Sequence, residues 1–177
     1  TKLFPGVKAL DGVDFTLKEG EIHALLGENG AGKSTFIKVI TGVHEPEEGE
    51  IYLRGRRVQF TSPRDAQQHS IAAIYQHGTA YPHLSVTENI FAGHERAGRF
   101  GVLRWGAMHR EAGELLRELG SDINPKSHMG DLTVAEQQIV EIAKAISTRA
   151  RIIIMDEPTA ALSRRECEEL YRITAKL

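Results

Sequence analysis

The 177-residue sequence contains little cysteine and no long apolar stretch. Its single cysteine, Cys167, excludes an internal disulfide, and a reducing compartment is the simplest interpretation. No apolar stretch approaches the ~18 residues that a membrane-spanning helix needs, and the first residues lack a signal-peptide pattern. If the protein works at a membrane, we therefore expect it to dock on something that spans the bilayer.

Basic charge is not in excess either. The formal net charge is −2 and the isoelectric point is near 6.4, which gives no support to a broad basic face for nucleic acid. His94-Glu95 does not extend to the zinc motif H-E-x-x-H, because Gly98 stands where the second histidine belongs, and there is no G-x-S-x-G. The sequence therefore does not favour a zinc protease of the H-E-x-x-H type or a serine hydrolase of the G-x-S-x-G type.

The sequence does contain a pattern that is typical of phosphate binding, G-x-x-x-x-G-K-[ST]. It is made by Gly27, Glu28, Asn29, Gly30, Ala31, Gly32, Lys33, Ser34 and Thr35. Residues 21–26 before it predict a buried strand, and residues 34–41 after it predict a helix that Gly42 caps. In such a loop the N–H groups point at phosphate, Lys33 reaches the β- and γ-phosphates and Ser34 ligates Mg²⁺. The pattern favours a nucleoside triphosphate site over a glycine-rich turn that merely joins strand to helix.

A second motif is the apolar run 152–155, which is followed by Asp156 and Glu157. An apolar run without alternation suits a central parallel strand that is covered on both faces. Asp156 is placed to hold Mg²⁺ as a Walker-B aspartate does, and Glu157 to polarise an attacking water. The alternative is an ordinary strand followed by a charged loop.

The remaining pattern changes from strands to helices along the chain. Residues 12–17, 49–53, 58–60 and 71–75 predict further strands, Ser62-Pro63 opens a short helix, and a longer helix over about 106–119 ends at Gly120. Capping boxes are predicted at Ser85–Glu88, Thr133–Glu136 and Ser163–Glu166. A helical block of about 77–148 thus interrupts a nucleotide-binding α/β core.

Together these motifs resemble the ATP-binding subunit of ATP-binding-cassette (ABC) transporters, over essentially the whole chain. Phe4 lies 29 positions before Lys33 (33 − 4), at the place of an adenine-stacking aromatic, and Gln76 matches the Q-loop glutamine. Residues 132–138 stand at the place of the LSGGQ signature and residues 160–163 at that of the D-loop. Three stretches, 4–13, 93–95 and 138–144, look like the simple-sugar importers of the ribose, galactose and xylose type.

The resemblance implies a fold and a set of partners. The fold is an α/β P-loop NTPase core with a mixed or parallel sheet, an N-terminal antiparallel β subdomain and an inserted helical subdomain. Residues 1–76 and 149–177 would form the core, and about 77–148 the helical signature subdomain. ATP hydrolysis would power sugar import at the cytoplasmic face of the cell membrane. A second cassette (same chain or dimer), transmembrane permease subunits and, indirectly, a sugar-binding protein are the implied partners, with no nucleic acid.

The resemblance also implies roles for single residues. Glu157, Lys33 and Gln76 would be catalytic, and Ser34, Gln76 and Asp156 would hold Mg²⁺. Phe4 and the loop of residues 27–35 would bind ATP. Thr133 and Ala135 of the signature would complete the ATP site of the second cassette.

The signature departs from LSGGQ at four positions. Thr133 replaces serine but keeps a hydroxyl. Val134 and Ala135 replace both glycines, and Glu136 replaces glutamine, which places a negative charge near an anionic ligand unless it faces away.

The sequence also lacks a histidine beyond Asp156, where the family has its switch histidine; the last one is His128. We therefore expect a truncated first cassette that binds nucleotide but hydrolyses it weakly or not at all. Two alternatives stay open at this point. One is a soluble ABC ATPase that acts on ribosomes or DNA, and the other is a nucleotide-binding module without hydrolysis.

Overall fold

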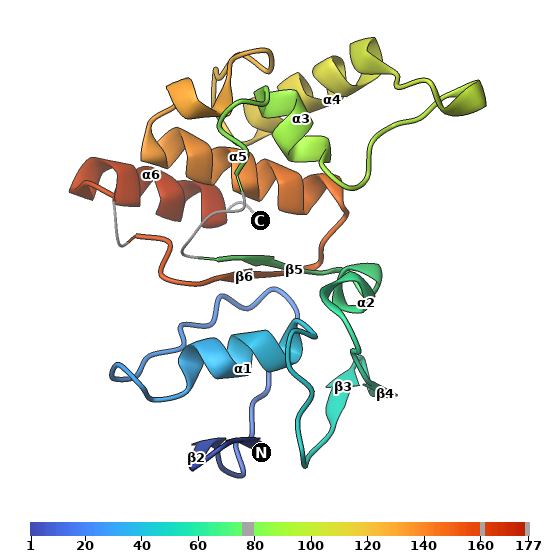
Figure 1. Cartoon of the computed structure of the whole chain (residues 1–177). Coiled ribbons are helices and arrows are strands. Elements are labelled where there is room, and N and C mark those ends of the chain that lie inside the picture. Colours follow the sequence, from blue (N-terminus) through green and yellow to red (C-terminus); the bar gives the residue numbers. More distant parts are fainter. Residues whose placement is uncertain (76–79, 160–161, 176–177) are drawn as a thin grey trace. The chain divides into compact units, whose positions relative to one another are not determined.

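The computed structural model describes residues 1–75, 80–159 and 162–175, and the chain divides into two compact units, Thr1–Ile71 and Ala72–Leu177 (Figure 1). The first unit contains β1 (Lys2–Phe4), β2 (Val7–Leu10), α1 (Lys33–Ile40), β3 (Ile51–Leu53), β4 (Arg56–Val58) and α2 (Pro63–Gln68). β5 (Ile71–Ile74) leads into the second unit, which continues with α3 (Val86–Phe91), η1 (Arg99–Gly101), α4 (Trp105–Glu118), η2 (Met129–Asp131), α5 (Val134–Ser147), β6 (Ile152–Met155) and α6 (Arg164–Thr174).

Two antiparallel hairpins and one central helix organise the first unit. β1 pairs with β2, with Phe4 opposite Val7, and β3 pairs with β4, with Ile51 opposite Val58. α1 packs against β2, and its buried residues are Ile37 and Val39. The antiparallel β element expected near the N-terminus is therefore present, although the β1–β2 pair itself had not been predicted.

Two predicted strands of this unit, residues 12–17 and 21–26, are wrong. The structure has no strand at either place, and two apolar side chains there are largely exposed, Ile22 at 71% and Leu26 at 88%. An apolar run indicates burial, but a strand also needs a hydrogen-bonded neighbour. Within the described ranges neither segment pairs with another strand. Phe15 does pack edge-on against Phe36 of α1, with ring centroids 5.0 Å apart.

The second unit has a single apolar core enclosed by α3, α4, α5 and α6 (Figure 1). Its most deeply buried side chains are Val86, Ile90, Phe91, Met108, Ala112, Leu116, Met129, Val140, Ile142, Ala143 and Ile173, each at most 1% exposed. β5 and β6 form a two-stranded sheet, and Ile153 and Met155 of β6 pack against the same core. None of the described helices is long and apolar enough to cross a bilayer.

The helix ends confirm the predicted capping signals. Capping boxes are present at Ser85–Glu88, Thr133–Glu136 and Ser163–Glu166, and Ser62 caps α2 with Pro63 at its first position. α4 ends at Glu118, one residue before the predicted Leu119, and Gly120, the predicted stop signal, has a φ of 79°. The Gly120 amide bonds the Arg117 carbonyl and the Ser121 amide bonds the Leu116 carbonyl, each at 2.9 Å, which is the Schellman arrangement.

α5 ends in the same arrangement, but with an arginine where α4 has glycine. The Arg149 amide bonds the Ile146 carbonyl at 2.7 Å and the Ala150 amide bonds the Ala145 carbonyl at 3.2 Å. Arg149 consequently has a φ of 59°, in the left-handed region that a side chain with a Cβ atom disfavours.

We expect Arg149→Gly to raise the free energy of unfolding by about 0.5 kcal/mol. Relief of the left-handed backbone strain, about 1–2 kcal/mol, is partly offset by the larger entropy of glycine in the unfolded chain. Urea denaturation followed by far-ultraviolet circular dichroism measures the change. The mirror-image control is Gly120→Ala, which should lower stability, because its Cβ atom would also lie 3.2 Å from the Arg172 guanidinium. A lower stability of Arg149→Gly would contradict the strain argument.

Candidate functional site

The predicted phosphate loop leads directly into the first turn of α1. Gly30 and Gly32 have φ values of 84° and 88°, so the chain turns twice through the left-handed region before the helix begins. The Lys33 ammonium folds back into the loop, where it donates to the carbonyl oxygens of Gly27 at 2.7 Å and Glu28 at 2.9 Å. Ser34, in the same turn, is an exposed residue. A cation, a helix N-terminus and a hydroxyl are thus gathered at one place.

Gly32 fixes the helix N-terminus against the neighbouring hairpin. A Cβ atom on Gly32 would lie 2.5 Å from the Ala9 carbonyl oxygen and 3.0 Å from Leu10 Cδ2, both in β2. Gly27 is less tightly confined, since its Cβ atom would approach that of Ala31 at 3.2 Å. Glycine at position 32 is therefore required twice, by the backbone conformation and by the close approach of β2.

Phe4 lies at the end of β1, with 38% of its surface exposed. Its ring contacts the His44 ring edge-on, with centroids 5.3 Å apart, and the Lys2 ammonium lies 5.5 Å from the ring centroid. Lys2 also binds Glu47 at 2.6 Å, and this bond, together with the Leu3 amide, holds the pKa of the Glu47 carboxyl below its usual value. Phe4 is thus held in place by its neighbours and still exposes part of its ring.

The acidic pair follows β6. The Asp156 amide donates to the Ile74 carbonyl at 2.9 Å, which ties the end of β6 to the end of β5. Glu157 is exposed and has a φ of 49°, an uncommon conformation for a residue with a Cβ atom. Gln76, predicted as a metal ligand and catalytic residue, lies outside the described residues, as do residues 160–161 of the predicted D-loop.

The predicted signature forms the N-terminus of α5. The Thr133 hydroxyl accepts from the Glu136 amide at 3.3 Å, and the Glu136 carboxylate accepts from the Thr133 amide at 2.8 Å and from its hydroxyl at 2.9 Å. The charge of Glu136 is therefore directed at its own helix. This capping box does not use the amides of Val134 and Ala135.

The candidate residues are shared between the two units. Phe4 and the loop 27–35 lie in the first unit, where α1 and the β1–β2 hairpin hold them. Thr133, Ala135, Asp156 and Glu157 lie in the second.

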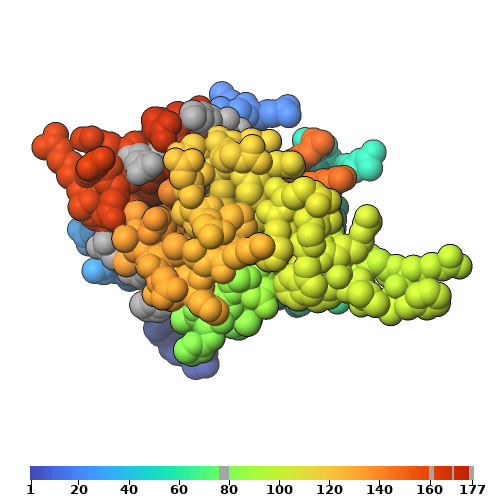
Figure 2. All heavy atoms as spheres, turned by 90° about the horizontal axis from the view of Figure 1, so that it is seen from above, coloured from blue at the N-terminus to red at the C-terminus, as the bar shows by residue number. Residues whose placement is uncertain are grey.

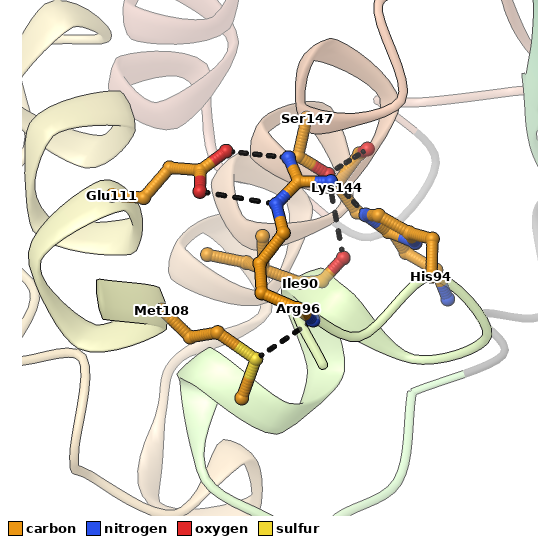
Figure 3. A network of polar contacts seen from close by, with 7 residues as sticks. All are labelled: Ile90, His94, Arg96, Met108, Glu111, Lys144 and Ser147. Carbon is orange, nitrogen blue, oxygen red and sulfur yellow. Dashed lines mark hydrogen bonds and ion pairs between the residues drawn. The ribbon is translucent and has the colours of Figure 1, made fainter. Parts of the chain in front are cut away.

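Sequence reasoning missed a polar network around His94, in the stretch 93–95 that had been assigned only to a subfamily pattern. His94 Nε2 lies 2.8 Å from Ser147 Oγ, which also donates to the Lys144 carbonyl at 2.7 Å (Figure 3). The network joins the segment after α3 to the last turn of α5. His94 and Ser147 are 53 residues apart, so no local pattern could have paired them.

The pKa of His94 is lowered, first because burial disfavours the imidazolium and further because Arg96 and Lys144 repel it, whereas the Ala92 backbone and Glu95 act in the opposite direction. A folded-state pKa below the unfolded value of 6.5 means that the unfolded chain takes up the proton first as the pH falls. The stability due to neutral His94 is therefore complete above pH 6.5 and is lost below it.

We expect the free energy of unfolding to decrease as the pH falls below 6.5, by less than ~1.4 kcal/mol per pH unit for this one proton. Denaturant titrations across this range measure the slope, and His94→Gln should flatten it. The exposed His83, changed to glutamine, is the matched control from the same unit. An unchanged slope in His94→Gln would show that other groups carry the pH dependence.

Comparison with known proteins identifies the protein family to which the chain is similar. A family model described as ABC transporter matches residues 10–160. The chain is 51% identical, over its whole length, to the ribose import ATP-binding protein RbsA 1 of Agrobacterium fabrum, and 54% identical to the protein of the same name from Rubrobacter xylanophilus. It is 50% identical, over 99% of its length, to a putative ribose/galactose/methyl galactoside import ATP-binding protein of Burkholderia lata. In each case the chain spans 35% of the relative's length.

Solved structures of ABC transporter cassettes have a similar fold. The ATP-binding cassette MJ1267 of an ABC transporter aligns with 99% of this chain and 73% of its own at a TM-score of 0.87 and 27% identity. The dimeric bacterial ABC transporter cassette MJ0796 aligns with 96% of this chain and 74% of its own, at a TM-score of 0.76 and 26% identity.

Proposed function

Because this chain belongs to the ABC transporter family and has the P-loop NTPase fold of its ATP-binding cassettes, we propose that it binds ATP with Mg²⁺ and hydrolyses it to power the import of a simple sugar. The observation that carries the proposal is the phosphate loop. The Lys33 ammonium, the N-terminus of α1 and the exposed Ser34 all lie at this one loop. Such a combination of a cation with helix N–H groups favours a polyphosphate anion.

The residues present fit Mg²⁺. Ser34 and Asp156 offer a hydroxyl and a carboxylate, the oxygen donors that this ion prefers, and Mg²⁺ commonly takes only one or two protein ligands besides phosphate and water. We infer that Ser34, Asp156 and Gln76 hold the ion. When bound, it would neutralise charge on the phosphate oxygens.

The chain's own groups would supply the rest of the chemistry. Lys33 and the loop N–H groups stabilise negative charge on the β- and γ-phosphates, which is the main requirement of phosphoryl transfer. Glu157 orients a water molecule and accepts its proton as that water attacks the γ-phosphorus. Phe4 stacks on adenine.

The signature would act on a second nucleotide. We propose that Thr133 and the Ala135 amide contact the ATP of a second cassette. The Glu136 carboxylate bonds the Thr133 amide and hydroxyl at the start of its own helix, which directs its charge away from that ligand. We propose the domain division given above, with residues 1–76 and 149–177 as the ATPase core and about 77–148 as the helical signature subdomain.

The proposed partners follow from the names of the relatives. Relatives at about 50% identity are named as ribose or galactose import proteins, and one structural neighbour is a dimeric cassette. We therefore propose a second cassette, permease subunits that span the membrane, and an indirect link to a sugar-binding protein. The protein would work peripherally, at the cytoplasmic face of the cell membrane.

This function is tested by measuring the uptake of radiolabelled ribose, galactose and xylose into membrane vesicles that carry the assembled importer. The vesicles are oriented so that ATP and the cassette are inside and the sugar is added outside. We expect ATP-dependent uptake of one of these sugars, and its loss when Lys33 is changed to alanine. The matched control is Lys38→Ala, an exposed lysine on the same helix. ATP binding without uptake of any simple sugar would exclude the sugar importer and retain the nucleotide site.

A further inference from the structure

Between α3 and α4 the chain forms a narrow arm that projects from the rest of the second unit. We define this arm as residues 97–104. Figures 1 and 2 show it in yellow-green, projecting at the right-hand edge of each view. Ala97 and Leu103 form an antiparallel bridge, the Gly98 amide donates to the Val102 carbonyl at 2.8 Å, and the Arg104 amide donates to the Arg96 carbonyl at 2.9 Å. The arm is thus a small hydrogen-bonded hairpin.

The base of the arm is fixed to the helical core. The Arg96 guanidinium makes two bonds to the Glu111 carboxylate of α4, at 2.6 and 3.2 Å (Figure 3). Its backbone amide also contacts Met108 Sδ at 3.3 Å, and Met108 is 1% exposed. These contacts hold the two strands of the arm at a defined exit point on α4.

The tip of the arm is apolar although it is exposed. Phe100 is 92% exposed and Val102 68%, and Trp105, the first residue of α4, is 42% exposed. Phe100 also has a φ of 67°, which an aromatic residue disfavours. A strained backbone and an exposed apolar side chain both disfavour the folded state. Such features often occur at sites that bind another molecule.

Every charged residue within the arm is basic. These residues are Arg99 and Arg104, and the nearest acidic residues in the sequence, Glu95 and Glu111, lie outside it. Arg96 is neutralised by Glu111, whereas the Arg99 guanidinium lies 5.6 Å from the centroid of the exposed Phe100 ring. Arginine beside exposed aromatic and aliphatic groups complements the headgroup region of an anionic bilayer, where rings enter the apolar boundary and guanidinium groups bind lipid phosphates.

We propose that the arm binds an anionic bilayer surface, with Phe100 and Val102 entering the interface and Arg99 and Arg104 contacting lipid phosphates. A membrane suits this tip better than a protein partner does. A stable protein interface needs ~800 Å² from each side, which a turn of this size does not offer, whereas a few apolar side chains and cations suffice at a bilayer. The inference deepens the proposed location at the membrane and depends on that proposal alone, not on ATP binding.

Trp105 is the only tryptophan of the chain, and it adjoins the arm, so its fluorescence reports on this contact. We expect a shift to shorter wavelength when the full chain is mixed with phosphatidylcholine vesicles that contain about one third phosphatidylglycerol, and none with phosphatidylcholine alone. Arg99→Gln and Arg104→Gln should each weaken binding about fivefold, which corresponds to ~1 kcal/mol per basic residue. Phe100→Gly, which keeps the positive φ without strain, should weaken it at least fivefold.

Two exposed residues of α6 provide matched controls, Tyr171→Ser for the aromatic ring and Arg164→Gln for the charge. Both should bind vesicles like the unchanged protein. No binding to anionic vesicles, equal binding to neutral ones, or equal losses in the controls would overturn the proposal. So would an arm variant that binds lipid normally but fails to bind permease in the same lipid, which would assign the arm to the protein partner. ATP binding, titrated in the same samples, separates failure of the arm from failure of the nucleotide site.

Discussion

ATP hydrolysis by the assembled importer is expected to fall by at least about a hundredfold when Glu157 is changed to glutamine, while nucleotide binding persists. General base catalysis typically contributes about 10²–10⁴-fold to a rate, and the amide of glutamine cannot accept the proton of the attacking water. The change retains side-chain size and the backbone position after β6. Phosphate release at saturating MgATP measures turnover, and equilibrium titration in the absence of turnover measures binding.

A matched control for this prediction is Glu168→Gln on α6. The Glu168 side chain is 68% exposed and pairs with the exposed Arg164 on the surface, so its loss should leave turnover unchanged. The Glu157 variant should also accumulate an ATP-dependent dimer or closed form, because nucleotide would be bound and not consumed. Normal turnover would move the catalytic role to another residue, with Asp156 and Gln76 the next candidates.

For Lys33→Ala we expect ATP affinity to fall at least tenfold. A hydrogen bond to a charged group contributes about 1.5–3 kcal/mol, and ~1.4 kcal/mol is tenfold in affinity. The structure adds a second cost, because Lys33 also bonds the Gly27 and Glu28 carbonyls and thereby closes the loop. Titration with a fluorescent ATP analogue measures the change.

Lys38→Ala, on the exposed side of the same helix, controls for loss of charge alone. Circular dichroism would show whether α1 still forms in both variants. Equal affinities of the Lys33 variant and the unchanged protein would remove residues 27–35 from the nucleotide site.

Local signals allowed correct prediction of the helix boundaries. In all three capping boxes the two partners lie three residues apart, so both appear in one short window of sequence, as with Thr133 and Glu136. The end of α4 just before Gly120 was predictable because glycine is the residue type that takes positive φ without strain. The conformation of residues 27–35 was predictable for the same reason, because the two glycines with positive φ and the start of α1 lie within nine consecutive residues. Phosphate binding by this loop stays a prediction.

Pairings between distant residues could not be predicted in this way. Residues 21–26 have the composition of a buried strand, but whether they pair depends on a neighbour that the run itself does not specify. The same reason hid the contact of His94 with Ser147 and the closeness of Gly32 to Ala9. The family resemblance was confirmed because it rests on motif order along the chain, whereas the roles of single residues such as Phe4 and Gln76 stay predictions.

The close packing of Gly32 on β2 has a consequence for the choice of nucleotide. Ala9 touches the start of α1, and the strand that contains it pairs with β1, at the end of which Phe4 lies. If Phe4 stacks on the base, the β1–β2 hairpin fixes the distance between the base and the phosphates. An aromatic ring stacks on any base. The site would therefore select nucleotides by the distance between base and phosphates and not by the hydrogen-bonding groups of the base. Guanosine and inosine triphosphates would then substitute for ATP at this cassette.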